Sequence, residues 1–325
     1  MGERFGITMG DASGIGPEIV LKAWSRGELR HLVVVYGDLA ILEHSNERLG
    51  YGVALGRWEP STTPADGVLN VRDLGILGPG HLEIGRVSAH AGRAAREYVV
   101  AATRAALAGE IAAMVTLPVN KEAVRLTDPG FTGHTELVGE LCGSRDVTIM
   151  LVSDELIVTH VSTHVSLVEA IARVKQERIR AILRLTVDAV GRLRPNPRIA
   201  VAGLNPHAGE HGLFGDEDER EIAPAVAWAR AQGMPVEGPF PPDTLFHLAV
   251  RKKRFDAIVC MYHDQGHIPL KLLDFEGGVN VTLGLPIVRT SVDHGTAFDI
   301  AWQGKASTVS LVRALEMAVK LAAKR

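Results

Sequence analysis

Apolar runs of strand length alternate with helix-period segments along most of the chain. A short continuous apolar run predicts a buried strand, and apolar residues recurring about every three or four positions predict an amphipathic helix. The predicted strands span residues 4–9, 32–36, 111–117, 147–152, 156–161, 198–204, 257–262 and 279–283. The predicted helices span residues 17–24, 87–108, 134–142, 176–193 and 310–323. Residues 49–80 are rich in glycine and proline, and the pattern assigns no element there.

Strand, helix, strand repetition with nearly continuous apolar strands predicts an α/β fold whose sheet is buried and mostly parallel. Residues 147–152 and 156–161 flank the turn Ser153-Asp154 and are interpreted instead as an antiparallel pair. This pair indicates a second domain with a mixed sheet. No linker rich in proline, glycine and serine separates two halves, so we expect the two domains to be interleaved along the chain.

The amino-acid composition is that of a globular protein, and it bears on the cellular compartment in which the protein is expected. The chain has 325 residues, of which 46% are hydrophobic and 22% charged, and its formal net charge is −3. The basic excess expected of nucleic-acid or anionic-membrane binding is absent, and we interpret the basic run at 251–254 as a solvated surface. Two cysteines exclude a disulfide scaffold and suit a reducing compartment. Without a secretory signal or an apolar stretch of about 18 residues, we expect a cytoplasmic protein.

Four polar clusters follow predicted strand ends or turns, where open α/β sheets bind ligands. The first is the glycine-rich turn at residues 10–17, between a strand and a helix that opens with Pro17. Such a turn presents backbone N–H groups to an anion, although its spacing matches neither a dinucleotide fingerprint nor a P-loop. An anion-binding loop and a plain tight turn therefore both remain open.

The second cluster combines residues 116–121 with residues 132–136 and places His134 and Thr135 at a predicted helix start. Hydroxyl and imidazole groups at a helix start can bind a ligand. The plainer alternatives are that Thr135 caps the helix and that His134 is a structural histidine.

The third cluster consists of His164, His207 and His263, each beside a predicted strand end. Neutral imidazole is a common zinc ligand, and three protein ligands with an open fourth position suit a catalytic metal. Asp264 and Asp243 are candidate acceptors that orient the rings. Because the separations along the chain are long, no local spacing rule supports the site, and three structural histidines remain the alternative.

The fourth cluster contains Lys271, Asn280 and Arg289, followed by the polar stretch 293–299. Lysine and arginine on opposite sides of a short turn can clamp a phosphate or a carboxylate, and arginine supplies a bidentate fork. Surface ion pairs are the alternative. That alternative suits Lys271 poorly, since this residue stands in the apolar run 268–273.

Several long motifs occur in a fixed order along nearly the whole chain. They are Gly6-Ile7-Thr8-Met9-Gly10-Asp11, Gly14-Ile15-Gly16-Pro17-Glu18, Gly203-Leu204-Asn205-Pro206-His207-Ala208-Gly209-Glu210, Tyr262-His263-Asp264-Gln265-Gly266, Val279-Asn280-Val281-Thr282-Leu283-Gly284-Leu285-Pro286 and Arg289-Thr290-Ser291-Val292-Asp293-His294-Gly295-Thr296. Together they resemble the 4-hydroxythreonine-4-phosphate dehydrogenase family of pyridoxal phosphate biosynthesis, from residue 6 to about residue 306.

The resemblance implies the isocitrate/isopropylmalate dehydrogenase-like fold, in which two α/β domains with mixed sheet interlock, and it implies a homodimer. We expect domain 1 to comprise residues 1–128 and 285–325 and domain 2 to comprise residues 129–284. Domain 2 is expected to carry the metal site and the dimer interface.

By motif match the resemblance implies a role for most of the polar clusters. It places one divalent metal on His164, His207 and His263, at a site shared between two subunits. It places substrate contacts on His134, Thr135, Lys271, Asn280 and Arg289. It implies that NAD or NADP binds the loop of His294, Gly295, Thr296, Ala297 and Asp299, as in the wider isocitrate dehydrogenase superfamily. The predicted catalytic residues are Lys271, Asp264 and Asp243.

The predicted reaction is the NAD(P)-dependent oxidation and decarboxylation of a 4-phosphorylated β-hydroxy acid, assisted by Zn, Mg, Co or Mn. The metal is expected to act as a Lewis acid on the hydroxyl during hydride transfer. The metal and Lys271 are expected to stabilise the enolate that forms when carbon dioxide leaves. The sequence leaves Asp264 and a metal-bound water open as the base.

Departures from the biosynthetic family pattern bear on the substrate. Ala12-Ser13 stands where Pro-Ala is usual, and Trp302-Gln303 where glycine with a basic residue is common. Residues 119–121 and 134–136 look more like the paralogues that act on D-threonate 4-phosphate or D-erythronate 4-phosphate. The candidate substrates are these two acids and 4-hydroxy-L-threonine 4-phosphate. Alternatives are a cis-dihydrodiol carboxylate dehydrogenase and a non-catalytic homologue that binds a small molecule.

Overall fold

The computed structural model describes residues 3–275 and 277–323, which form two compact units. Unit 1 contains the chain up to Arg145 together with Leu285–Ala323, and unit 2 contains Asp146–Gly284. The outer limits of the predicted domain 1, residues 1 and 325, lie outside the described residues. Unit 1 is therefore built from two stretches of sequence that flank unit 2.

Unit 1 has a sheet whose neighbouring strands all run parallel in the described residues, in the order β3-β4-β2-β1-β5-β12. The strands are β1 Arg4–Thr8, β2 Leu32–Gly37, β3 Leu55–Arg57, β4 Leu69–Asp73, β5 Ala113–Thr116 and β12 Arg289–Val292. Nearly every residue of β1, β2 and β5 is buried. A parallel sheet is covered on its faces, which explains why these strands are continuously apolar. The predicted buried, parallel sheet is confirmed.

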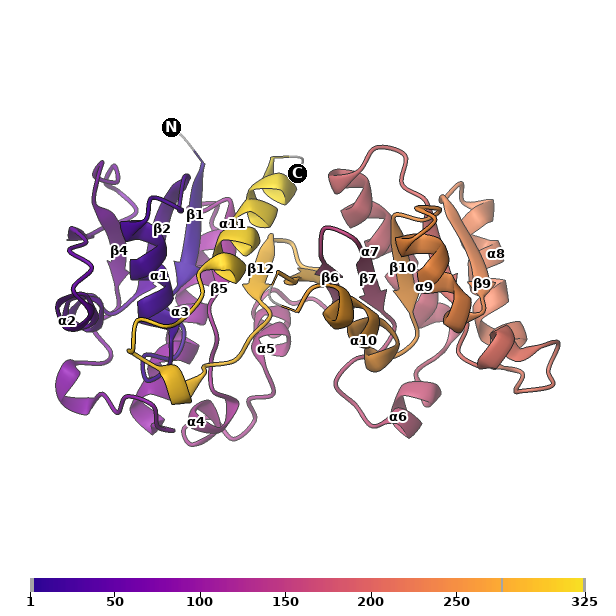
Figure 1. Ribbon diagram of the computed structural model, residues 1–325, viewed down its shortest axis with the longest axis horizontal. Coiled ribbons are helices and arrows are strands. Elements are labelled where there is room, and N and C mark those ends of the chain that lie inside the picture. Colours follow the sequence, from indigo (N-terminus) through magenta and orange to yellow (C-terminus); the bar gives the residue numbers. More distant parts are fainter. Residues whose placement is uncertain (1–2, 276, 324–325) are drawn as a thin grey trace. The chain divides into compact units, whose positions relative to one another are not determined.

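The helices of unit 1 pack on this sheet or on one another (Figure 1). They are α1 Gly16–Ser25, α2 Leu39–Leu49, α3 Ala89–Leu107, α4 Lys121–Arg125, α5 His134–Leu141 and α11 Val309–Ala322, with the 3-10 turns η1 Pro79–His81 and η4 Phe298–Ile300. The long helix α3 packs against β1, β2 and β5, and α11 packs against β5 and β12. Alanine has the highest helix propensity, and its small side chain lets α3 approach its neighbours closely.

Unit 2 has a mixed sheet in the order β11-β6-β7-β10-β8-β9. The strands are β6 Thr148–Val152, β7 Ile157–His160, β8 Ile199–Ala202, β9 Val236–Phe240, β10 Ala257–Cys260 and β11 Val279–Leu283. Strand β6 is antiparallel to both β7 and β11, which confirms the predicted antiparallel pair. The strands β7, β10, β8 and β9 run parallel. Their carboxyl ends therefore share one edge of the sheet.

The helices of unit 2 are α6 Leu167–Ala172, α7 Gln176–Leu193, α8 Ala223–Ala231, α9 Pro242–Val250 and α10 His263–Leu273, with the 3-10 turn η2 Pro206–Gly209 and the π-helical turn η3 Asp218–Ile222. A core cluster joins Leu151 and Val158 from the sheet to Leu245 of α9 and Leu270 of α10. This packing fixes the amino-terminal end of α10, which carries His263, at the sheet edge.

The structure differs from the sequence expectation in one domain boundary and in several elements. The α-helices and strands outside residues 49–80 that were not predicted are α2, α4, α6, α8, α9, α10, β9 and β12. Residues 129–145, expected in domain 2, lie in unit 1 because α5 packs against α3. Residues 49–80, which received no assignment, contain β3, β4 and the first two residues of η1. These are short, and β3 is only three residues long, so no hydrophobic period develops in them.

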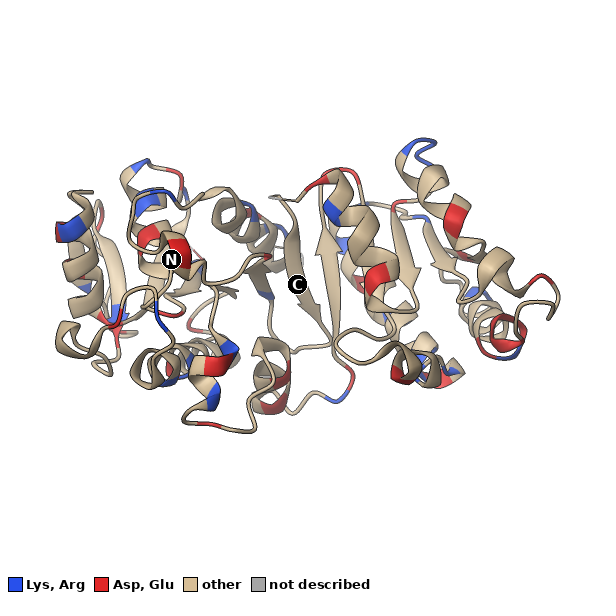
Figure 2. Ribbon diagram, turned by 60° about the horizontal axis from the view of Figure 1, so that its bottom comes forward, with Lys and Arg blue, Asp and Glu red and all other residues tan. Residues whose placement is uncertain are grey.

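Acidic and basic residues are intermixed along the elements of both units (Figure 2). Figure 2 shows blue and red segments interspersed over the elements of each unit. Within the described ranges, no helix is both long enough and apolar enough to cross a membrane. The cytoplasmic location stays a prediction.

Candidate active site

The glycine-rich turn that follows β1 is closed by the protein's own hydrogen bonds. The N–H of Ser13 donates to Asp11 Oδ1 at 2.9 Å, and the N–H of Gly14 donates to the Asp11 carbonyl at 3.0 Å. The N–H of Ile15 donates to the Thr296 carbonyl at 3.0 Å. A Cβ on Gly14 would lie 2.6 Å from that same carbonyl oxygen, so only glycine fits there. These amides are engaged, which favours the tight structural turn over an anion-binding loop.

Asp11 in this turn makes the stability of the protein depend on pH. Burial raises the pKa of Asp11 to about 6, although the N–H groups of Ser13 and Asn120 lower it. Because the folded pKa lies above the unfolded value of 3.8, this group's stabilising contribution is lost as pH rises from about 4 to 6. The loss amounts to about 3 kcal/mol.

We therefore expect Asp11→Asn to gain stability relative to the wild type, by about 3 kcal/mol, between pH 4 and pH 7. Urea unfolding followed by circular dichroism at several pH values measures this difference. Asp66→Asn is the matched control, since Asp66 is exposed. A difference between Asp11→Asn and wild type that stays constant with pH would contradict the prediction.

The loop predicted to bind the nucleotide follows β12 in unit 1. Thr296 in this loop accepts the hydrogen bond from Ile15, and the indole N–H of Trp302 donates to the Ala12 carbonyl at 3.0 Å. These bonds hold the loop against the glycine-rich turn. On its other side the loop is open, because His294 and Gly295 are exposed and a Cβ at Gly295 would meet nothing within 4 Å. An anchored loop with an open rim after a parallel strand fits a bound nucleotide.

Three predicted substrate residues come together in unit 1. Arg289, at the start of β12, is only 2% exposed. Its guanidinium donates to the Thr135 hydroxyl at 3.3 Å and to the Thr116 hydroxyl at 2.9 Å. Burial lowers the pKa of Arg289 to about 10, and the charge of Glu136 opposes this shift, so the side chain remains a cation at neutral pH. A buried cation beside threonine hydroxyls suits an anionic ligand.

His134 lies beside this cation at the first turn of α5. Burial, together with the charges of Arg289 and Lys121, holds the pKa of His134 well below its usual range. The imidazole is therefore neutral. Its Nε2 atom is buried and has no hydrogen-bond partner among the residues that the structure describes. A buried ring nitrogen without a partner is suited to hydrogen bonding with a bound ligand. Lys121 and Thr116 also belong to this cluster, although they were not among the predicted substrate residues.

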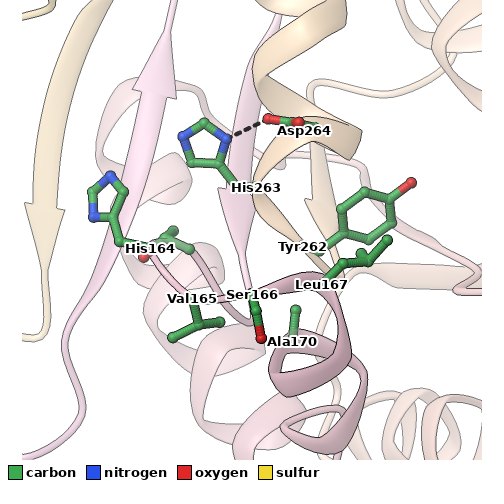
Figure 3. Close-up of a pocket in the computed structure, with 9 residues that line it drawn as sticks. His164, Val165, Ser166, Leu167, Ala170, Tyr262, His263 and Asp264 are labelled. Carbon is green, nitrogen blue, oxygen red and sulfur yellow. Dashed lines mark hydrogen bonds and ion pairs between the residues drawn. The ribbon is translucent and has the colours of Figure 1, made fainter.

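Two of the predicted metal ligands face each other at the sheet edge of unit 2 (Figure 3). His164 follows β7 and His263 begins α10, and their ring centroids are 5.6 Å apart. His263 Nδ1 lies 2.6 Å from Asp264 Oδ1. A carboxylate in this position can accept a hydrogen bond from Nδ1–H of the imidazole, an arrangement in which Nε2 is the atom that would bind a metal.

The imidazole pair borders a pocket of about 520 Å³. The lining residues are Thr163, His164, Val165, Ser166, Leu167, Ala170, Tyr262, His263 and Asp264. Figure 3 shows Val165 and Ala170 at its base and Tyr262 and Leu167 on the side away from His164. Apolar walls with a few convergent polar groups are typical of a binding pocket.

The third predicted ligand, His207, does not join this pair within one chain. Its ring contacts Phe214, with centroids 6.0 Å apart, and its Nδ1 lies 3.5 Å from the carboxylate of Glu210. Among the described residues, no group of three or more His, Cys, Asp or Glu side chains is arranged to hold a metal. Asp243 is exposed at the start of α9, which packs against the turn η2 that carries His207.

The remaining predicted substrate residues, Lys271 and Asn280, belong to unit 2. The Lys271 ammonium lies 5.4 Å from the ring centroid of Phe275. The apolar run around Lys271 is surface and not core, since Ile268 and Leu272 are largely exposed. Asn280 lies on β11, and its Oδ1 is buried without a hydrogen-bond partner in the described part of the chain. That orphaned oxygen suits a ligand that donates a hydrogen bond.

Sequence reasoning missed two further histidines beside the pair. His267 stacks on His263 with ring centroids 3.5 Å apart, and His160 lies 4.7 Å from His267. Burial, with the neighbouring imidazoles, lowers the pKa of His160 to about 3 and that of His267 to about 4, so both rings are neutral. The helical spacing of His263 and His267 is visible in the sequence, whereas the approach of His160 is not.

The chain is similar in sequence to a known protein family and to named relatives. Residues 28–318 match the model of a family described as pyridoxal phosphate biosynthetic protein PdxA. The chain is 47% identical to the D-threonate 4-phosphate dehydrogenase of Salmonella typhimurium, covering 97% of this chain and 98% of the relative. It is 45% identical to the 4-hydroxythreonine-4-phosphate dehydrogenase of Geobacter metallireducens, covering 98% and 95% of the two chains.

Solved structures of dehydrogenases are also similar to this chain. The 4-hydroxythreonine-4-phosphate dehydrogenase of Klebsiella pneumoniae superposes with a TM-score of 0.89 at 44% identity, covering 98% of this chain and 99% of that one. A terephthalate 1,2-cis-dihydrodiol dehydrogenase from Burkholderia xenovorans gives 0.72 at 31% identity, covering 98% of each chain. Isocitrate dehydrogenase from Methylococcus capsulatus gives 0.51 at 13% identity, covering 98% of this chain and 85% of that one. The last match concerns the fold alone, and the predicted isocitrate dehydrogenase-like fold is confirmed.

Proposed function

The chain belongs to the PdxA family and is a dehydrogenase, and from this premise we propose that it oxidises and decarboxylates a 4-phosphorylated β-hydroxy acid. We favour D-threonate 4-phosphate as the substrate, because the Salmonella typhimurium relative that carries this name is 47% identical over nearly the whole chain. The nearest alternatives are D-erythronate 4-phosphate and 4-hydroxy-L-threonine 4-phosphate, which share a carboxylate, a hydroxyl at the β carbon and a terminal phosphate.

The observation that carries the proposal is the buried cation of Arg289 between Thr135 and Thr116. Hydrogen bonds from arginine to phosphate are charge-assisted and strong. The guanidinium of Arg289 would bind a substrate phosphate with a bidentate fork. The Nε2 atom of His134, which is buried without a hydrogen-bond partner among the described residues, would form a hydrogen bond with the same phosphate. We assign further substrate contacts to Lys271 and Asn280.

We further propose that a divalent metal binds the imidazoles of His164 and His263, with His207 of the partner subunit as the third ligand. The hydrogen bond between Asp264 and His263 supports this, since carboxylates commonly orient metal-binding imidazoles in this way. His207 follows the end of β8, beside β10 in the same sheet, yet its own contacts are with Phe214 and Glu210. When bound, the metal would act as a Lewis acid toward the substrate hydroxyl.

Exposed apolar side chains on unit 2 support a homodimer. Ile268 and Leu272 lie on one face of α10, with Leu272 86% exposed, and Val168 on α6 is 80% exposed. Leu213 and Phe214, which follow His207 on the same loop, are also exposed. Exposed apolar groups can mark an interaction site, and a second copy of the chain would cover them while delivering its His207.

The catalytic roles follow from where the predicted residues lie. Lys271 would stabilise the negative charge that develops on the keto oxygen as carbon dioxide leaves. Asp264 is engaged with His263, so we assign it to orienting that imidazole. Asp243 lies on α9 beside the turn of His207 and would arrive with it from the partner subunit. We therefore propose Asp243 as the proton acceptor for the substrate hydroxyl.

We propose that NAD or NADP binds the loop of His294, Gly295, Thr296, Ala297 and Asp299. The support is the exposed rim of this loop and its anchoring through Thr296 to Ile15. The bound nicotinamide would accept the hydride from the substrate carbon. The exposed Asp299 carboxylate would accept a hydrogen bond from a ribose hydroxyl.

A substrate panel tests the proposed function. Formation of NADH or NADPH is followed by absorbance with the three phosphorylated acids, with their unphosphorylated forms and with the cis-dihydrodiol of terephthalate, while released carbon dioxide is measured in parallel. We expect reduction of the cofactor with a phosphorylated acid, release of carbon dioxide, and loss of both on treatment with a chelator.

The rival functions give different outcomes in the same assay. Oxidation of the dihydrodiol alone would favour the second candidate function, for which the match to the Burkholderia xenovorans enzyme is the supporting observation. Cofactor reduction with none of these compounds would favour a homologue that only binds a small molecule. Either result would overturn the proposal.

A further inference from the structure

His267 stacks on the proposed metal ligand His263. The two residues stand one helical turn apart on α10, their ring planes differ by 10°, and their centroids are 3.5 Å apart. His267 Nδ1 lies 3.0 Å from the His263 carbonyl oxygen and donates a hydrogen bond to it. The His267 side chain is nearly buried, at 8% exposed. His267 is therefore held by both its ring face and its Nδ1 atom.

Buried groups behind His267 keep it in this position. His160 is fully buried at the end of β7, with its ring centroid 4.7 Å from that of His267. Gly266 leaves the space for this packing, because a Cβ there would lie 2.5 Å from His160 Nε2. The rings of His164, His263, His267 and His160 thus form a continuous row from the pocket into the core. Because His160 packs against His267, and His267 stacks on His263, the packing of His267 restricts the orientation of the His263 ring.

The stacked geometry excludes His267 as a second ligand of the same ion. An imidazole coordinates through a lone pair that lies in its ring plane. Because the planes of His263 and His267 are nearly parallel and 3.5 Å separates their centroids, their lone pairs do not converge on one point. His267 can therefore affect the proposed metal ion only through its contact with His263.

We propose that His267 is a positioning residue that fixes the plane of the His263 ring for metal binding. The proposal rests on the metal site of the proposed function. Asp264 sets the rotation and tautomer of His263 through Nδ1, and His267 sets its tilt by stacking. Together they aim His263 Nε2, so the ring loses little freedom when a metal binds.

Two substitutions separate stacking from the other properties of His267. His267→Phe keeps a flat ring, and His267→Leu keeps the bulk but not the plane, while both remove the Nδ1 hydrogen bond. His247→Ala is the matched control, since His247 is exposed on α9. The purified dimers are stripped with a chelator and titrated with Co²⁺ by calorimetry, and the visible Co²⁺ absorption bands report the ligand geometry.

We expect His267→Leu to bind Co²⁺ about tenfold more weakly, with shifted visible bands, and His267→Phe to stay within about threefold of the wild type. Unchanged affinity and bands in His267→Leu would overturn the proposal. Equal weakening in both variants would assign the effect to the hydrogen bond and overturn stacking as the cause. Should His267→Leu fail to fold, His267→Met carries the same expectation.

Failure of the underlying metal site would look different. In that case the wild type itself would not bind Co²⁺, or would bind it equally well after His164→Ala. That outcome would overturn the metal part of the proposed function, whereas a normal wild type with an unaffected His267→Leu would overturn the positioning role alone.

Discussion

A heterodimer with His164→Ala in one subunit and His207→Ala in the other is expected to show about half of the wild-type turnover. Each homodimer is expected to lose activity about a thousandfold or more, because one metal ligand is missing from every site. In the heterodimer both lesions fall in one of the two shared sites, and the other site is intact. The structure supports this arrangement because His164 and His263 face each other while His207 contacts Phe214.

Co-expression of the two variants with different affinity tags allows the heterodimer to be purified. Its turnover and its bound metal per dimer are then measured against the wild type. A heterodimer of His164→Ala with His263→Ala is the matched control, and it should remain inactive because each site has lost one ligand. Recovery in the control, or no recovery in either pair, would contradict the shared site as assigned.

Arg289→Met is expected to lower kcat/KM for the phosphorylated substrate about a thousandfold. The variant should fold, since methionine fills much of the space and removing a buried charge relieves its desolvation. Arg289→Lys should lie between methionine and wild type, because lysine keeps the charge and loses the fork that matches a phosphate. Steady-state kinetics with each variant measure the effect.

The unphosphorylated form of the same acid is the internal control for Arg289. Its low kcat/KM should change little in Arg289→Met if the guanidinium binds the phosphate. An equal loss with both forms would show that Arg289 binds the carboxylate instead. Thr116→Val serves as a matched variant, since it removes the 2.9 Å contact to Arg289 without removing the charge.

Much of the fold could be predicted from the sequence. Continuous apolar runs gave the buried strands, such as 32–36, and the turn at Ser153-Asp154 gave the antiparallel pair of β6 and β7. Long motifs such as residues 262–266 gave the family, because such blocks do not arise by chance. The short strands β3 and β4 could not be predicted, since three to five residues are too few to establish a period.

The candidate site was predicted residue by residue but not in its arrangement. The sequence named His134, Thr135 and Arg289 as substrate contacts. It placed Thr116 in the same polar cluster without a substrate role, and Thr116 accepts a hydrogen bond from the Arg289 guanidinium. The apolar run around Lys271 also indicated that a surface position suits this residue poorly, yet Ile268 and Leu272 in this run are largely exposed. Contacts between residues far apart in the chain depend on strand order, which local patterns do not specify.

Local periodicity in the sequence identified many of the long helices and buried strands and the parallel character of the first sheet, and motifs read in order identified the family. The folded chain was needed to show that the amides of Ser13, Gly14 and Ile15 already donate hydrogen bonds, and that His207 does not join the other two imidazoles among the described residues. It also decided that His267 and His160 back His263. Hydrogen bonds and ring stacking depend on distances between residues that are far apart in the sequence. Those distances are set by the order of strands in the sheet, which local sequence patterns do not specify.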